Sequence, residues 1–263
     1  MTLCVVWRDG TNIKFASDSR LSFRSVGTSD CGVKIARIPF NIYGPTEPNG
    51  EKPLLFCGDL GMAFAGSAIG ALIVKEALVE VLYSMQCIPT FHDYGMDGIA
   101  DFVFRAYGVI SKDLCATILE QGLTRIVFAG YCATQQKLRA FRIETDSQNQ
   151  RQKCEVLIGE RDMEIFGSGG EAARSRMPSG ANESEIISVV QAVIDDPAVP
   201  SVGGNLQYGS FAGSKFRPMG VAKIGDSGVH YWRASLDLNG PDFDQADLLP
   251  NFPLLDFTGA HYL

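Results

Sequence analysis

Three residues near the start of the chain, Thr2, Asp18 and Lys34, have the types that nucleophilic catalysis needs and follow one another at intervals of 16 residues. Removal of Met1, which is expected before a small residue, would leave Thr2 with a free α-amine. The ordinary pKa of such an amine is about 7.7–8.0, so part of it is neutral near pH 7. Thr2 would then supply both the attacking hydroxyl and the base that accepts its proton. Many cytosolic chains also begin with Met-Thr and carry no such activity.

Lys34 and Asp18 are the partners that this chemistry requires. An ammonium group near the Thr2 hydroxyl would stabilise the developing alkoxide and would lower the pKa of the α-amine by like-charge repulsion. Lys34 is expected in a strand, and Asp18 would supply its counter-charge, because an unpaired buried ammonium costs several kcal/mol. Without Thr2 at its fixed offset, the alternative is an exposed strand lysine and an ordinary turn aspartate.

Two glycine-containing segments, 65–68 and 167–170, each lie between a predicted strand and a predicted helix. The N-terminus of a helix presents unpaired N–H groups and the positive end of a dipole, so Gly66 could donate to an oxyanion. Gly66 could equally serve a tight turn, with Ser67 as the helix cap. The segment 167–170 is not followed by Lys-Ser or Lys-Thr, so it does not match a phosphate-binding loop.

In these features the chain resembles the proteasome β-subunit family, including the bacterial homologues of the HslV and Anbu kind. In that family an N-terminal threonine begins the first strand, an A-x-D-S-R segment follows the second strand (ASDSR at 16–20 here), and a lysine in a short G-x-K-I strand lies beside the nucleophile. The resemblance extends from Thr2 to about residue 236. It implies an α+β fold, the four-layer αββα sandwich of the N-terminal-nucleophile (Ntn) hydrolases.

The resemblance also implies the roles of the site residues. The catalytic residues would be Thr2, Asp18, Lys34 and Ser168, and Gly66 would bind the oxyanion. Leu21, Ser22 and Gly32 would pair with an extended peptide, and Phe64 would lie near the base of the first specificity pocket.

One support of the family is missing at its usual place. Family members place an aspartate three residues before a serine that precedes Gly-Gly, whereas Ala198 occupies that position before Ser201 here. Either Asp195 or Asp196 reaches Ser168 from a remodelled loop, or this support is absent.

The function that follows is a threonine-type endopeptidase that cleaves peptide bonds through an acyl-enzyme on Thr2. Its partners would be further copies of the chain in stacked hexameric or heptameric rings, a peptide or unfolded protein as substrate, and an unidentified ATPase unfoldase. Two alternatives remain open: a non-catalytic scaffold with the proteasome fold, and an Ntn amidohydrolase that acts on small amides.

The hydrophobic patterns predict two sets of elements around this site. Apolar residues at helical spacing predict helices, and alternating or β-branched runs predict strands. Helices are expected at 67–84, 95–119, 170–175 and 183–195. Strands are expected at 2–7, 12–17, 32–38, 54–58, 61–65, 124–133, 137–145, 153–159, 163–166, 204–212, 215–224 and 228–236, with loops at 18–31 and 40–53. Two stacked sheets with helix pairs outside would bury both patterns, in one domain at 1–238 followed by a C-terminal arm at 239–263.

The composition excludes several classes of protein. The net charge of -7, without a run of Lys or Arg, argues against a nucleic-acid partner. Seven scattered cysteines without a CxxC pair, and three histidines, predict neither a disulfide framework nor a metal site, and no cofactor is expected. The first residues lack the features of a signal peptide, and the most apolar stretch, near 62–84, contains Lys75, Glu76 and Glu80, so a cytoplasmic protein without a membrane span is expected.

Overall fold

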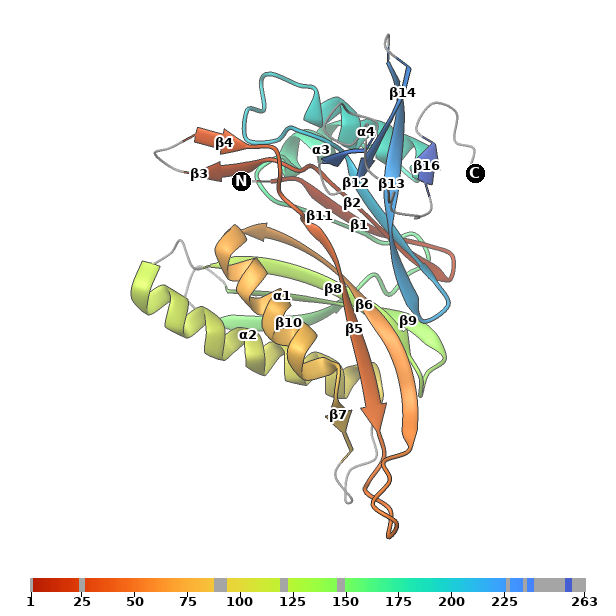
Figure 1. Cartoon of the computed structure of the whole chain (residues 1–263). Coiled ribbons are helices and arrows are strands. Elements are labelled where there is room, and N and C mark those ends of the chain that lie inside the picture. The colour runs from red at the N-terminus through yellow and green to blue at the C-terminus, as the bar shows by residue number, and fades with distance from the viewer. Residues whose placement is uncertain are drawn as a thin grey trace.

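The computed structural model describes residues 2–23, 27–87, 94–118, 123–145, 150–225, 228–233, 236–238 and 254–256. It has a mixed α/β fold, mostly sheet, with the two large sheets packed against each other (Figure 1).

The larger sheet has eight strands in the order β11-β1-β2-β12-β13-β14-β15, and β16 pairs with β13. Their bounds are β1 (Cys4–Asp9), β2 (Asn12–Ser17), β11 (Met163–Phe166), β12 (Gln207–Ala212), β13 (Lys215–Gly225), β14 (Gly228–Arg233), β15 (Leu236–Asp237) and β16 (Leu254–Asp256). Strands that are far apart in the sequence therefore lie side by side, because β2 pairs with β12.

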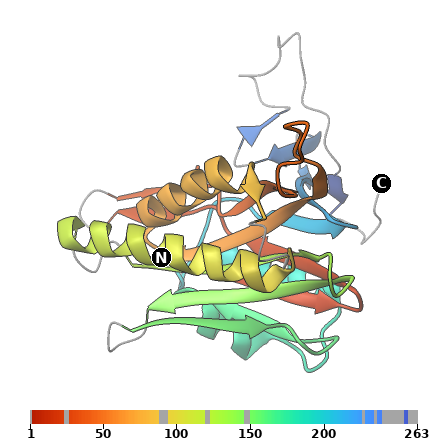
Figure 2. The ribbon, with the colours of Figure 1, turned by 90° about the horizontal axis from the view of Figure 1, so that it is seen from below.

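The second sheet has six strands in the order β10-β9-β8-β6-β5-β7. Their bounds are β5 (Ile35–Tyr43), β6 (Leu54–Gly66), β7 (Met85–Gln86), β8 (Thr124–Cys132), β9 (Lys137–Thr145) and β10 (Arg151–Val156), while β3 (Leu21–Phe23) and β4 (Gly27–Ser29) form a separate small hairpin. The helices are α1 (Ala68–Leu82), α2 (Met96–Ile118), α3 (Gly170–Arg176) and α4 (Glu183–Ile194). Figure 2 shows α1 and α2 lying along one side of the six-stranded sheet.

Successive side chains of a strand point to opposite faces of its sheet, and the hydrophobic core is accordingly divided into three clusters. One cluster joins the six-stranded sheet to α1 and α2, and includes Leu60, Ile126 and Val74. A second lies between the two sheets, with Val6 and Phe15 facing Val127. The third joins the eight-stranded sheet to α3 and α4. Each sheet is thus covered by apolar residues on both faces.

The predicted helices and most predicted strands are confirmed within a few residues, with corrections in the first half of the chain. The strand expected at 32–38 begins only at Ile35 and continues to Tyr43, so the loop at 40–53 is shorter than expected. The strands expected at 54–58 and 61–65 are one strand, β6. Part of the polar loop expected at 18–31 forms the β3–β4 hairpin.

Asp59 lies at the point where the sequence pattern predicts two strands and the structure has the single strand β6. A strand-interior aspartate next to Gly58 suggests a turn, yet Asp59 is buried and accepts a hydrogen bond of 3.1 Å from the backbone N of Phe216. Burial raises the pKa of the Asp59 carboxyl, and the nearby Lys215 and Arg37 oppose this shift. A partner more than 150 residues away in the chain therefore stabilises a strand that local pattern argues against.

The segment 239–263, expected to be a C-terminal arm, contributes one described strand. Leu254–Asp256 forms β16, which runs parallel to β13, and Leu255 is buried in the cluster that faces α3 and α4.

Candidate active site

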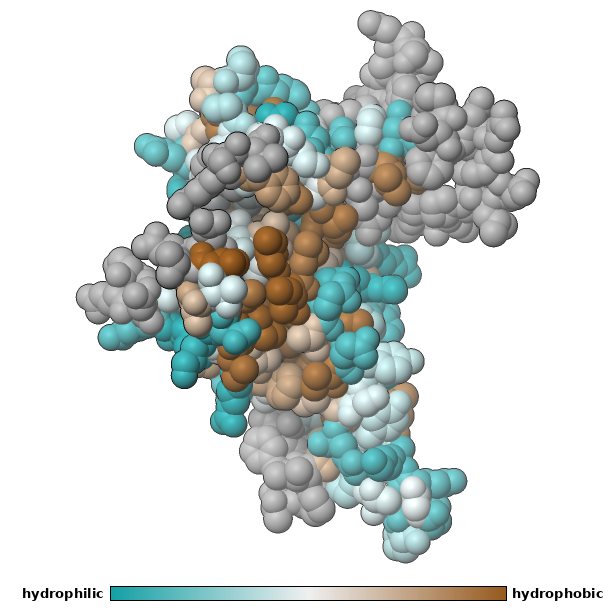
Figure 3. Space-filling model, turned by 60° about the vertical axis from the view of Figure 1, so that its left-hand side comes forward, coloured by the Kyte–Doolittle hydropathy of each residue, from teal (hydrophilic) through white to brown (hydrophobic). Residues whose placement is uncertain are grey.

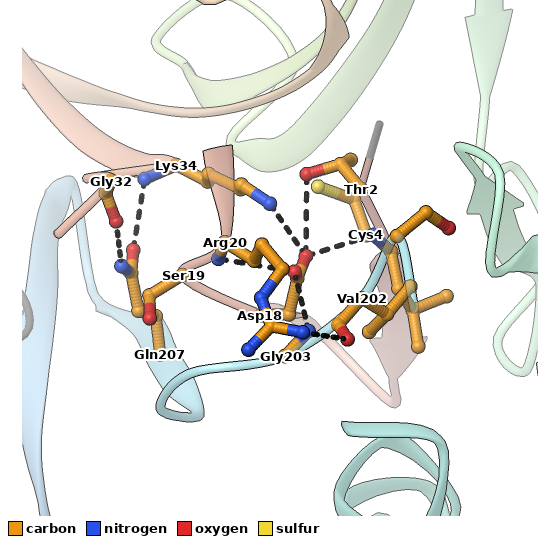
Figure 4. A network of polar contacts seen from close by, with 12 residues as sticks. Thr2, Cys4, Asp18, Ser19, Arg20, Gly32, Lys34, Val202, Gly203 and Gln207 are labelled. Carbon is orange, nitrogen blue, oxygen red and sulfur yellow. Dashed lines mark hydrogen bonds and ion pairs between the residues drawn. The ribbon is translucent and has the colours of Figure 1, made fainter. Parts of the chain in front are cut away.

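Asp18, which directly follows β2, is the centre of the polar network in Figure 4. Its carboxylate is fully buried and accepts hydrogen bonds on both oxygens. Oδ1 accepts from Leu3 N at 2.8 Å, Thr2 Oγ1 at 3.2 Å and Lys34 Nζ at 2.7 Å, and Oδ2 accepts from Arg20 N and Gly203 N at 3.2 Å each. The three residues that the sequence singles out therefore meet at one carboxylate oxygen.

The hairpin of β1 and β2 explains how Thr2 reaches Asp18. The turn at Asp9-Gly10 sets a register in which Cys4 pairs with Ser17. Thr2 and Asp18 lie just beyond the last pair, so the side chain of one meets the other. The Thr2 hydroxyl is held toward the site by a buried acceptor rather than by solvent, since Thr2 is 3% exposed.

Lys34 approaches the same oxygen from the segment that precedes β5. Its side chain is 1% exposed, and its ammonium forms an ion pair with Asp18. A charged group at this depth is tolerated only with a well-placed counter-charge. The shared oxygen keeps the ammonium beside the Thr2 hydroxyl, where it can stabilise negative charge.

The backbone of Thr2 is held by the turn between β11 and α3. Thr2 N donates to Ser168 Oγ at 3.1 Å, and Gly169 N donates to Thr2 O at 3.1 Å. Gly167 has a φ of +94°, and an added Cβ would lie 2.8 Å from the Thr2 carbonyl carbon. Glycine is needed at this position both for the left-handed backbone and for the close approach of Thr2.

The aspartate support expected for Ser168 is not found at either candidate. Ser168 Oγ lies 2.9 Å from Ser201 Oγ. Asp196 instead pairs with Arg176 and accepts from Ala198 N, and Asp195 accepts from Gln191. Within the described residues, the contacts of Ser168 therefore end in hydroxyl and backbone groups, and no carboxylate reaches it.

A cleft of about 950 Å³ opens beside Thr2. Its lining includes seven of the nine predicted site residues: Thr2, Leu21, Ser22, Lys34, Phe64, Gly66 and Ser168. Asp18 lies behind this lining, fully buried. The lining of the cleft also includes Arg125, which is paired with Glu144.

Gly32 is the one predicted site residue that the structure places elsewhere. It is buried and does not line the cleft. Its N–H donates to Ser19 O at 2.9 Å, and its carbonyl accepts from the side chain of Gln207. Both backbone groups of Gly32 are therefore already used inside the protein, and its pairing with a peptide stays a prediction.

Gly66 ends β6 with a φ of +103°, and Ser67 caps α1 by accepting from Gly70 N at 3.1 Å. The turn and the cap that the sequence suggests are thus both present. Gly66 also faces the cleft beside Thr2, at the positive end of the α1 dipole.

Two side chains of the site were missed by sequence reasoning. Cys4 Sγ donates to Phe64 O at 3.1 Å, and burial raises the pKa of this thiol to about 12, although the nearby Lys34 lowers it. The thiol therefore stays protonated and is no competitor to Thr2 as nucleophile. The strand alternation already predicts an inward Cys4. Gln207, by contrast, has no local signal, because its partners lie more than 170 residues earlier.

Over the residues that the structure describes, no group of three or more His, Cys, Asp or Glu side chains is placed to hold a metal ion. The described helices are too short or too polar to cross a membrane.

Comparison with known proteins identifies relatives by structure and not by sequence. No protein-family model matches the chain, and no curated protein does. Among solved structures, Anbu (ancestral beta-subunit) from Yersinia bercovieri matches with a TM-score of 0.57 at 15% identity, over 82% of this chain and 86% of that chain. An Anbu (Gly-1) mutant from Hyphomicrobium sp. strain MC1 matches with a TM-score of 0.54 at 14% identity, over 83% of this chain and 87% of that chain.

A third structure, the helical assembly of the Anbu complex from Pseudomonas aeruginosa, matches with a TM-score of 0.52 at 13% identity, over 92% of this chain and 89% of that chain. At such low identity these likenesses establish the fold alone. The fold is the proteasome-like one of the Anbu proteins, as the sequence motifs predict.

Proposed function

We propose that this chain is a threonine-type N-terminal-nucleophile hydrolase, an endopeptidase that works in a proteasome-like assembly of identical subunits. The observation that carries the proposal is the meeting of Thr2 Oγ1 and Lys34 Nζ at one buried oxygen of Asp18, at the edge of a cleft. A structural role alone gives no reason to bury this trio beside a cleft, because a buried ion pair is weak support for stability.

In the proposed reaction, removal of Met1 turns the nitrogen of Thr2 into an α-amine that faces Ser168. The Thr2 hydroxyl attacks the carbonyl carbon of the scissile bond, and its proton passes to the α-amine, directly or through water. The Lys34 ammonium stabilises the charge on the attacking oxygen, and the N–H of Gly66 donates to the oxyanion. The leaving amine takes the proton, and water then hydrolyses the ester on Thr2.

The substrate proposed is a peptide or unfolded protein that lies extended in the cleft. Leu21 and Ser22 lie on the short strand β3 at its wall and would pair with the peptide backbone. Phe64, in the lining near Thr2, would form the base of the first specificity pocket. An ATPase unfoldase would be required for folded substrates, and a cytoplasmic location is proposed with it.

The finer description of the fold belongs to the same proposal. The three hydrophobic clusters support a four-layer αββα sandwich, because helices pack on the outer faces of two stacked sheets. The proposed division is one domain at 1–238 and an arm at 239–263. Within this arm, β16 pairs with β13 of the same chain.

An exposed apolar face on α1 supports assembly with further copies of the chain. Ile69, Leu72, Ile73 and Val81 are between 41% and 55% exposed, although the opposite side of α1 is buried. Figure 3 shows hydrophobic side chains gathered on this side of the molecule. Exposed apolar patches of this kind mark interfaces. The similar structure from Pseudomonas aeruginosa is a helical assembly. Head-to-tail contacts between identical subunits give a ring when the rotation from one subunit to the next closes, and a helix when it does not.

Light scattering tests this face. The double variant Leu72→Glu/Ile73→Glu is expected to lower the mass of the assembly to that of a monomer, because two carboxylates would be buried at the contact. Val109→Glu is the matched control, since Val109 is 72% exposed on α2. An unchanged mass of the double variant would exclude α1 as the contact. A wild-type monomer would instead favour the small-amide hydrolase.

Intact mass spectrometry with a peptide epoxyketone tests the reaction, because this warhead requires a hydroxyl and a free α-amine on one residue. The expected result is a chain that has lost Met1 and carries one adduct at Thr2. Thr2→Ala should take no adduct. A wild-type chain that keeps Met1 and takes no adduct would contradict the proposal and support a non-catalytic scaffold.

A further inference from the structure

Gln207 is a buried polar residue that the proposed reaction leaves without a role. It begins β12 and is 3% exposed. In the sheet it pairs with Ser17, the residue before Asp18. The backbone of Gln207 is thus fixed beside the aspartate of the site by strand pairing.

The side chain of Gln207 reaches the segment that carries the lysine of the site. Its Oε1 accepts from Lys34 N at 2.9 Å and from Ile35 N at 3.2 Å, and its Nε2 donates to Gly32 O. All of the amide's contacts are therefore with the backbone of residues 32–35, and Figure 4 shows Gln207 beside Gly32 and Lys34.

This segment has little else to hold it. The pairing of β5 with β6 begins at Ile35, so Lys34 lies just before the ladder. The other backbone anchor is the bond from Gly32 N to Ser19 O. Because the side chain of Lys34 is buried and ends at Asp18, the position of its ammonium depends on where its backbone is held.

We infer that Gln207 is a positioning residue, whose amide sets the Lys34 ammonium against Asp18 and the Thr2 hydroxyl. The inference rests on the proposed function. Gln207 touches neither the cleft nor Thr2, so it acts through Lys34. A side-chain amide suits this task because it offers an acceptor to two N–H groups and a donor to a carbonyl, whereas an apolar side chain of the same size offers neither.

The test is the rate of Thr2 modification by a peptide epoxyketone, separated into the binding constant of the inhibitor and the maximal rate of adduct formation. Gln207→Leu is expected to lower the maximal rate about 10- to 100-fold, the range for loss of an outer contact that orients a functional group. The binding constant should change less than about twofold, because Gln207 does not line the cleft. The pH midpoint of the rate should move upward, since a displaced ammonium no longer lowers the pKa of the α-amine.

Gln191→Leu is the matched control, because Gln191 is also buried but lies on α4 and bonds to Asp195. Gln207→Glu keeps the acceptor for Lys34 N and Ile35 N, so its rate should fall between those of the wild type and Gln207→Leu. If Gln207→Leu does not fold, the inference is tested by the maximal rate of adduct formation and the pH midpoint of Gln207→Glu.

An unchanged maximal rate and pH midpoint, or an equal loss in Gln191→Leu, would overturn the inference. A wild type that takes no adduct would overturn the proposed function itself. A labelled wild type with unaffected Gln207 variants overturns the inference alone.

Discussion

The variant Asp18→Asn is expected to form no adduct with the peptide epoxyketone at Thr2. Its unfolding free energy should fall by about 3–5 kcal/mol, the range for a buried charge left without its partner. Asp18 accepts from five donors, spread over both of its oxygens. An asparagine must turn its NH2 group toward donors whichever way the amide is flipped, so at least two hydrogen bonds are lost. The ammonium of Lys34 would also lose its counter-charge.

Lys34→Met provides the comparison, because it removes the cation and leaves the carboxylate four of its donors. Its loss of unfolding free energy is expected to be smaller, about 1–3 kcal/mol, although the adduct is again lost. Urea denaturation of both variants measures the difference, with Glu160→Gln, an exposed carboxylate in the turn before β11, as control. Equal losses in the two variants, or a normal rate of modification in Asp18→Asn, would contradict the role given to Asp18.

Gly167→Ala is expected to slow adduct formation at Thr2 about 100-fold or more. The new Cβ would lie 2.8 Å from the Thr2 carbonyl carbon and 3.0 Å from Thr2 Cγ2, so Thr2 must move relative to Asp18. Displacement of a reacting group by about 1 Å can lower a rate by that amount. The left-handed backbone adds about 1–2 kcal/mol of destabilisation.

Gly213→Ala separates the two contributions. Gly213 also has a positive φ, +61°, but an added Cβ there meets nothing within 4 Å. Gly213→Ala should therefore show the backbone destabilisation in urea denaturation and a wild-type rate of modification. A wild-type rate in Gly167→Ala would show that Thr2 does not depend on this close approach.

The first part of the site could be predicted because it depends on local structure. The turn signal at Asp9-Gly10 and the alternation of 12–17 predict a hairpin, and its register brings Thr2 to Asp18. The spacing from Asp18 to Lys34 is equally regular, but the position of Lys34 depends on residues far away in the sequence. Residues 32–34 precede β5 rather than belong to it, and a side chain from β12 fixes them.

The sequence does not show where distant residues satisfy backbone groups. Gly32 was expected to face a peptide, yet Ser19 and Gln207 use its N–H and carbonyl. The same applies to β6, where Asp59 has its partner on β13. The pattern of a single chain shows which faces are apolar, but it does not show which distant donor meets which acceptor.

The contacts of Asp18 with both ends of the chain have a consequence for protein synthesis. Asp18 requires the N–H of Gly203, Thr2 requires Ser168, and the lysine segment requires Gln207. While the ribosome is still adding the first 200 residues, these partners have not all been made. The arrangement around Thr2 can therefore be completed only after Gln207 has been synthesised, so a shorter nascent chain does not carry the assembled site.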